Sequence, residues 1–207
     1  MIVTLAHGSR HPEAAPLTAE ITKAAADILS VPWHTTDLDN PDFAAVEEAV
    51  AQGKHVVVIP MLFTKAFHAT VDVPAAIAEI DTSGPGHVVL ADILGTGDDI
   101  AEVISNIAQA EAPEDAPLAI YAVGSSHDAA NVAVADLTTQ VSKLTGRDVD
   151  LYFATRGGLD IRPDAHVIPL FTTFGLLLNR IADHEQQSKP LGMRLVDIVV
   201  SRYREAV

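Results

Sequence analysis

The fold is decided by the stretch IVTLAHGS at residues 2–9, in which a short apolar run stops at a histidine followed by a glycine. Residues 2–6 have the character of a buried strand, and Gly8 allows the backbone to turn sharply behind it. The sequence therefore predicts a strand, a loop and then a helix, because apolar residues next recur at helical spacing at Ala14, Leu17, Ile21, Ala25 and Ile28.

The same alternation continues along the chain. We predict further strands at residues 55–59, 88–91, 118–123, 150–154 and 167–168, and helices at 42–52, after 73–74, at 98–110, at 129–144, in the segment up to about 184 and at 195–205. Short strands that alternate with amphipathic helices favour an α/β fold with doubly wound parallel sheets and helices on both faces. Ligands of such sheets bind in the loops beyond the carboxyl ends of the strands.

An internal repeat indicates two similar lobes. The letters VIP at 58–60 and LFT at 62–64 recur as VIPLFT at 167–172, in the same order relative to the first strand of each half. Between the halves, residues 111–117 are acidic, contain two prolines and lack periodicity, as expected of a linker. We therefore predict a first lobe at residues 1–112 and a second, degenerate lobe at 117–207.

Two histidines distinguish the halves. His7 ends the first strand and His68 follows Pro60 in the loop after a neighbouring strand, whereas the second half has Val123 in place of His7 and Leu176 or Leu177 in place of His68. Two ligands of one metal ion would be lost together, while two unrelated surface histidines have no reason to be. Neutral imidazole suits Fe, Co, Ni, Cu and Zn, so the pair predicts a metal site.

Composition narrows the functional classes. With no cysteine, any metal must be held by His, Asp or Glu. The 28 acidic and 13 basic residues give a net charge of -15, which repels nucleic acid and anionic membranes, so we expect neither as a partner. Residues 1–7 are too short an apolar run, without a basic segment, for a signal peptide or a membrane span. A cytoplasmic monomer or homodimer is the expectation.

Two motifs together point to a family. LAHGSR at residues 5–10, followed by Pro60, His68, Asp72 and Pro74 with seven, three and one residues between them, resembles the sirohydrochlorin chelatases. These enzymes insert cobalt or iron during the synthesis of cobalamin and sirohaem. The resemblance is close over most of residues 1–110 and looser over the second half.

The resemblance implies a chelatase-like fold with the active cleft between the lobes, in which His7 and His68 are the catalytic, metal-binding residues. The metal is then a substrate, Co²⁺ or Fe²⁺ with Ni²⁺ also possible, the second substrate is a tetrapyrrole, and no organic cofactor is expected. Two positions depart from the family's pattern. Ala66 stands where a glycine is usual, and Thr96-Gly97 stands where His-Pro is common.

The chemistry of metal insertion agrees with a two-histidine site. The ion must be incompletely coordinated, and two protein ligands leave positions open for water and then for pyrrole nitrogen. Two pyrrole protons must also be removed, and an imidazole that titrates near neutrality is a suitable base.

Residues beside the histidines are candidates for substrate contacts. Ser9, Arg10 and Lys65 are expected to bind the tetrapyrrole's carboxylates, with arginines of the second half, Arg156, Arg162 and Arg180, as further candidates. Asp72 either supports His68 or caps the helix that begins at residues 73–74, and we favour the cap.

Other functions are less well supported. A nucleotide-binding enzyme would explain Gly95 and Gly97 after a strand, but the third glycine of the dinucleotide fingerprint and a phosphate-binding Gly-Lys-Ser/Thr loop are missing. A non-catalytic metal-binding or metal-delivery protein on the same scaffold is the main alternative. Visible absorbance separates this alternative from a chelatase, because only metal insertion changes the spectrum of a tetrapyrrole.

Overall fold

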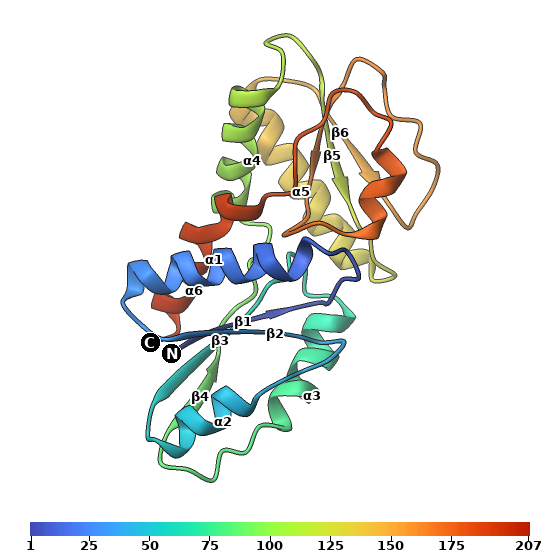
Figure 1. Cartoon of the computed structure of the whole chain (residues 1–207). Coiled ribbons are helices and arrows are strands. Elements are labelled where there is room, and N and C mark those ends of the chain that lie inside the picture. Colours follow the sequence, from blue (N-terminus) through green and yellow to red (C-terminus); the bar gives the residue numbers. More distant parts are fainter. The chain divides into compact units, whose positions relative to one another are not determined.

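The computed structural model describes residues 1–207 and confirms an α/β fold with two parallel sheets (Figure 1). The chain forms two compact units. Unit 1 consists of Met1–Gly95 and Leu195–Val207, and unit 2 consists of Thr96–Arg194.

Unit 1 has a four-stranded parallel sheet in the order β2-β1-β3-β4. Its strands are β1 (Ile2–Ala6), β2 (Trp33–Asp37), β3 (His55–Pro60) and β4 (His87–Leu90), and its helices are α1 (Ala14–Leu29), α2 (Ala44–Ala51), the π-helical turn η1 (His68–Asp72), α3 (Val73–Ala78) and α6 (Val196–Glu205). Helices α2 and α3 cover one face of the sheet, where Val3, Leu5, Val56 and Val58 pack in one buried cluster with residues of both helices. Helices α1 and α6 cover the other face, and the hydroxyls of Thr4 and Thr22 form a buried 2.6 Å hydrogen bond between β1 and α1.

Unit 2 has a three-stranded parallel sheet in the order β6-β5-β7. Its strands are β5 (Leu118–Ala122), β6 (Val149–Phe153) and β7 (His166–Pro169), and its helices are α4 (Asp98–Glu111), α5 (Asp128–Thr145), the 3-10 helix η2 (Leu176–Ile181) and the short turn η3 (Gly192–Leu195), which reaches the boundary with unit 1. Buried Tyr121 stacks on Phe171 with ring centroids 5.7 Å apart, and the Tyr121 hydroxyl donates to the carbonyl oxygen of Leu177.

The three strands of the unit 2 sheet correspond in order and central register to β2, β1 and β3 of unit 1, and β4 has no counterpart in unit 2. In unit 1, β1 lies between β2 and β3 with Leu5 opposite Pro60, and in unit 2, β5 lies between β6 and β7 with Tyr121 opposite Pro169. The residues that follow these strands therefore occupy corresponding positions, which supports the internal repeat.

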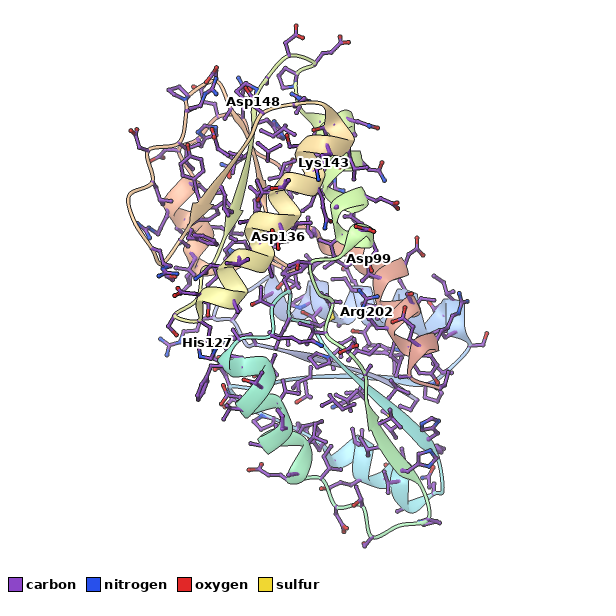
Figure 2. All side chains as sticks on the ribbon, turned by 180° about the vertical axis from the view of Figure 1, so that it is seen from behind. Asp99, His127, Asp136, Lys143, Asp148 and Arg202 are labelled. Atoms are coloured by element: carbon purple, nitrogen blue, oxygen red, sulfur yellow. The ribbon has the colours of Figure 1, made fainter.

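Helices α4 and α6 each belong to the other unit from the one expected from the predicted lobes of residues 1–112 and 117–207. Helix α4 packs on α5 and β7 of unit 2, whereas α6 packs on α1 and β3 of unit 1. In α6, Arg202 donates hydrogen bonds to the carbonyl oxygens of Ile93 and Leu94 (Figure 2). The boundary therefore follows Gly95 rather than residues 111–117. Helical periodicity shows that a helix has an apolar side, but not which sheet that side covers.

Two elements differ from the sequence-based expectation. Strand β2 was not predicted, because its letters WHTTD are mostly polar, and it lies at the edge of the sheet with only Thr36 buried. The helix expected up to about residue 184 is a short 3-10 helix that ends at Ile181. No helix combines the length and the apolar character needed to cross a membrane.

A buried histidine predicts how stability depends on pH. His166 is 5% exposed, its Nε2 lies 2.8 Å from the Ser188 hydroxyl, and burial lowers its pKa below the ordinary value of 6.5. As the pH falls, His166 is therefore protonated at a higher pH in the unfolded chain than in the folded protein, which favours unfolding. We expect the free energy of unfolding to decrease between pH 7.5 and 5, and His166→Gln to flatten this dependence, as measured by urea denaturation.

His127→Gln is the matched control, because His127 is exposed. A dependence on pH that stayed as steep in His166→Gln as in the unchanged protein would contradict the assignment.

Candidate metal centre

His7 is the first residue after β1, and the backbone that follows it requires a glycine. Gly8 has a φ of 105°, in the left-handed region, and a Cβ at this position would collide with the side chain of Asp39. Asp39 follows β2, the neighbour of β1. The turn at Gly8 thus directs the chain away from the sheet immediately after His7 and leaves its imidazole exposed at the sheet's carboxyl edge.

His68 begins η1, a single π-helical turn that leads into α3. Such turns are rare and occur often at functional sites. Because β1 and β3 pair in parallel, the segments that follow them emerge at the same edge of the sheet. The sequence placed His68 in a loop, but its position beside His7 agrees with the prediction.

The two imidazoles, called here the histidine pair, meet through their Nε2 atoms. These atoms lie 2.9 Å apart, and the rings are nearly perpendicular, with centroids separated by 4.1 Å. Bonds from a borderline divalent ion to imidazole nitrogen are about 2.0–2.1 Å long, so one ion reaches both atoms with an angle of about 90° between the bonds. No group of three or more His, Cys, Asp or Glu side chains that could hold a metal ion is present.

Asp72 determines which nitrogen of His68 is available. Its carboxylate Oδ2 lies 2.6 Å from Nδ1 of His68, which therefore carries the proton and leaves the Nε2 lone pair for a metal. His7 can present its own Nε2 lone pair when Nδ1 donates to the carbonyl oxygen of Gly8 at 3.4 Å. Asp72 does occupy the residue before α3, but its side chain makes no capping hydrogen bond, so the favoured capping role was wrong.

The three predicted substrate contacts lie in two places. Ser9 and Arg10 line a hollow of about 380 Å³ together with Asp37, Asp39 and Asn40. Lys65 forms an exposed 3.1 Å ion pair with Asp92. The sequence-based prediction supposed purely basic surroundings for Arg10 and Lys65, whereas acidic side chains lie beside both. Asp37 and Asp39 were missed because they end and follow the unpredicted β2, and the sequence carried no signal that Asp92, which follows β4, pairs with Lys65.

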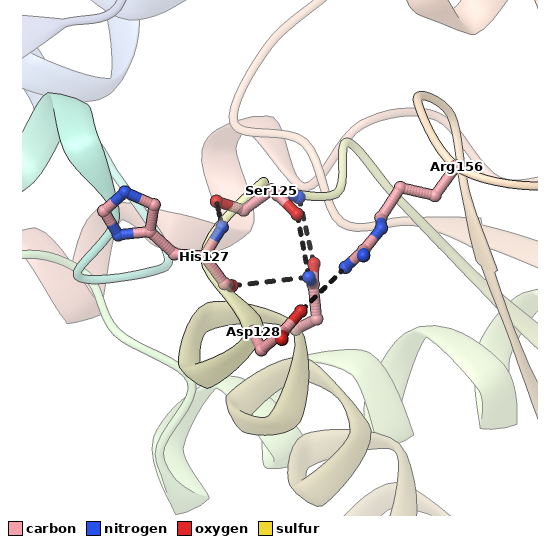
Figure 3. A network of polar contacts seen from close by, with 5 residues as sticks. Ser125, His127, Asp128 and Arg156 are labelled. Atoms are coloured by element: carbon pink, nitrogen blue, oxygen red, sulfur yellow. Dashed lines mark hydrogen bonds and ion pairs between the residues drawn. The ribbon is translucent and has the colours of Figure 1, made fainter.

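Unit 2 keeps the turn but not the histidine pair. The backbone N–H of His127 donates to the Ser125 hydroxyl oxygen at 3.1 Å, as that of His11 does to Ser9 at 3.2 Å, and the side chain of Asn131 braces the turn in unit 2 (Figure 3). Val123, in place of His7, is exposed. Of the two residues that could stand in place of His68, Leu176 is exposed and Leu177 is half-buried.

The arginines of the second half are engaged within unit 2. Arg156 lies 3.4 Å from the Asp128 carboxylate (Figure 3), Arg162 donates twice to Asp164, and Arg180 donates to the carbonyl oxygen of Ala154. The first two of these pairs are exposed and contribute little to stability.

Comparison with known proteins places these features in context. The family model CbiX matches residues 1–111, more than half of the chain. No curated protein matches this chain. The fold is similar to that of SirB from Bacillus subtilis with Fe³⁺, at a TM-score of 0.81 and 20% identity over 99% of this chain and 94% of that one. SirB from Bacillus subtilis subspecies spizizenii in complex with cobalt gives 0.80 and 20% over the same shares. CbiX, the terminal enzyme for siroheme biosynthesis in denitrifying bacteria, gives 0.71 and 16% over 100% and 99%.

The contact between His68 and Asp72 predicts a loss of metal affinity in Asp72→Asn. The amide can no longer attract the Nδ1 proton as a carboxylate does, so we expect Co²⁺ to bind about 10–100-fold more weakly, as measured by calorimetric titration. Asp27→Asn is the control, since Asp27 also forms an exposed pair four residues along a helix, with Lys23. Equal affinities in Asp72→Asn and Asp27→Asn would show that the contact does not support the site.

Proposed function

The chain belongs to the CbiX family, and on this premise we propose that it is a sirohydrochlorin chelatase, which inserts a divalent metal ion into the tetrapyrrole. The observation that carries the proposal is the 2.9 Å separation of the two Nε2 atoms of the histidine pair at the carboxyl edge of the unit 1 sheet. A metal ion held there by two ligands stays accessible to pyrrole nitrogen.

The same two imidazoles balance the protons of the reaction. Insertion of a divalent ion releases two pyrrole N–H protons. As the metal leaves the Nε2 atoms of His7 and His68 for the pyrrole nitrogens, these atoms become free to accept one proton each. The carboxylate of Asp72, hydrogen-bonded to Nδ1, stabilises the positive charge that then forms on His68.

Cobalt and iron are the metals we propose. The similar SirB structures contain Fe³⁺ and cobalt, and imidazole binds both elements as well as Ni²⁺. The ligand set does not choose between them, so the metal available in the cell decides which is inserted.

Removal of either histidine tests the mechanism. In His7→Ala or His68→Ala we expect the rate of Co²⁺ or Fe²⁺ insertion into sirohydrochlorin to fall by more than about a hundredfold, as followed by visible absorbance. The loss of a metal ligand should reduce the rate more than the loss of a hydrogen bond that supports the ligand. Both side chains are exposed, so the melting temperature should change little. His34→Ala, on β2, is the control.

The outcome also separates the two classes of function. If the unchanged protein binds the metal through the histidine pair but leaves the spectrum of sirohydrochlorin unaltered, it is a metal-delivery protein. Near-normal insertion by His7→Ala would refute the two-histidine mechanism.

Charge reversal tests the proposed carboxylate contacts of Arg10 and Lys65. We expect Arg10→Glu and Lys65→Glu each to weaken sirohydrochlorin binding by about 1–3 kcal/mol and to affect metal affinity less. Lys23→Glu introduces the same change in net charge at an exposed position of α1. An equal effect of Lys23→Glu would assign the loss to overall charge rather than to local contacts.

A further inference from the structure

Two exposed apolar side chains flank His68 along the chain. Phe67 is 50% exposed and Val71 is 46% exposed, and they stand four residues apart in the segment that carries His68 and Asp72. We call these two side chains the apolar row. Among the six phenylalanines of the chain, only Phe67 is exposed.

The apolar row takes no part in the core of unit 1. The buried cluster on this side of the sheet receives Val73, Ala76 and Ile80 from the segment that follows, and neither member of the apolar row. Single exposed apolar residues are common and need no special explanation. What distinguishes Phe67 is its neighbour, because its ring meets the His68 imidazole edge to face, with centroids 6.1 Å apart and planes at 85°.

We propose that the apolar row contacts the tetrapyrrole macrocycle, with Phe67 as its main contact. This inference rests on the proposed function. The four central nitrogens of the macrocycle must reach an ion held at the Nε2 atoms of His7 and His68. The ring then extends outward from that ion in its own plane, and an aromatic side chain beside the His68 imidazole falls within its span.

The chemistry of the row suits this part of the substrate. The macrocycle is a flat, largely apolar π-system whose carboxylates lie at its periphery. An aromatic ring gains from burial against such a system and from offset or edge-to-face contact with it. Polar groups near the site, in the hollow lined by Ser9 and Arg10 and at the Lys65–Asp92 pair, suit the periphery instead. Phe67 thereby contributes to substrate affinity and not to metal binding or proton transfer.

The test is the affinity for metal-free sirohydrochlorin, measured by absorbance titration without metal. In Phe67→Ala we expect the dissociation constant to rise about tenfold or more, as for the loss of one buried aromatic side chain, while Co²⁺ affinity and the melting temperature stay unchanged. Phe67→Trp should retain binding, Phe67→Leu should be intermediate, and Val71→Ala should show a smaller loss than Phe67→Ala.

Ile28→Ala provides the matched control, because Ile28 is 52% exposed on α1 in the same unit. In steady-state insertion assays, Phe67→Ala should raise KM and leave kcat within about threefold. If Phe67→Ala binds sirohydrochlorin as tightly as the unsubstituted protein does, this inference is wrong and the proposed chelatase function stands. Parallel loss of Co²⁺ affinity also overturns it, because Phe67 would then act by positioning His68. If the unchanged protein neither binds nor metallates sirohydrochlorin, both proposals fail.

Discussion

Parallel pairing between β1 and β3 is the constraint on which the histidine pair depends. The pairing places Leu5 opposite Pro60, so both strands end at the same edge of the sheet. His7 needs only the turn at Gly8 to reach this edge, and His68 reaches it through the segment that leads into η1. The buried residues of both strands maintain this register, so the exposed histidine pair is positioned by a core to which it contributes nothing.

The similar arrangement of strands in unit 2 shows that such a frame forms without the histidine pair. The three strands of unit 2 have the order and central register of β2, β1 and β3, and unit 2 keeps the glycine turn at Gly124, whose φ is 86°. Val123 stands in place of His7 at an exposed position, and the counterpart of His68 is either Leu176, which is exposed, or Leu177, which is half-buried against the core of unit 2. Side chains in the loops after strands are exposed, so they can be replaced without disturbing the core. The same exposure allows them to contact other molecules.

The sequence predicted those parts of the structure that leave a local pattern. Buried strands such as β3, the turn at Gly8 and the two histidines follow from apolar runs, a glycine and a repeat. Strand β2 is polar at the edge of its sheet, and the Asp39 side chain that packs against Gly8 follows it, so neither left a pattern. The sequence offered two roles for Asp72, a helix cap and a support of His68, and could not rank them, because only the side-chain direction shows that the carboxylate contacts His68 and makes no capping hydrogen bond.

Because α6 belongs to unit 1 and α4 to unit 2, the two units do not fold in the simple order of their synthesis. Translation releases the chain from its amino end, and domains usually complete in that order. Here Thr96–Arg194, the whole of unit 2, leaves the ribosome before α6, which covers the α1 face of the unit 1 sheet. The half that is synthesised first is therefore completed last. Until then the face of its sheet that carries α1 lacks α6, and the apolar surface that α6 will cover is open to a chaperone during synthesis.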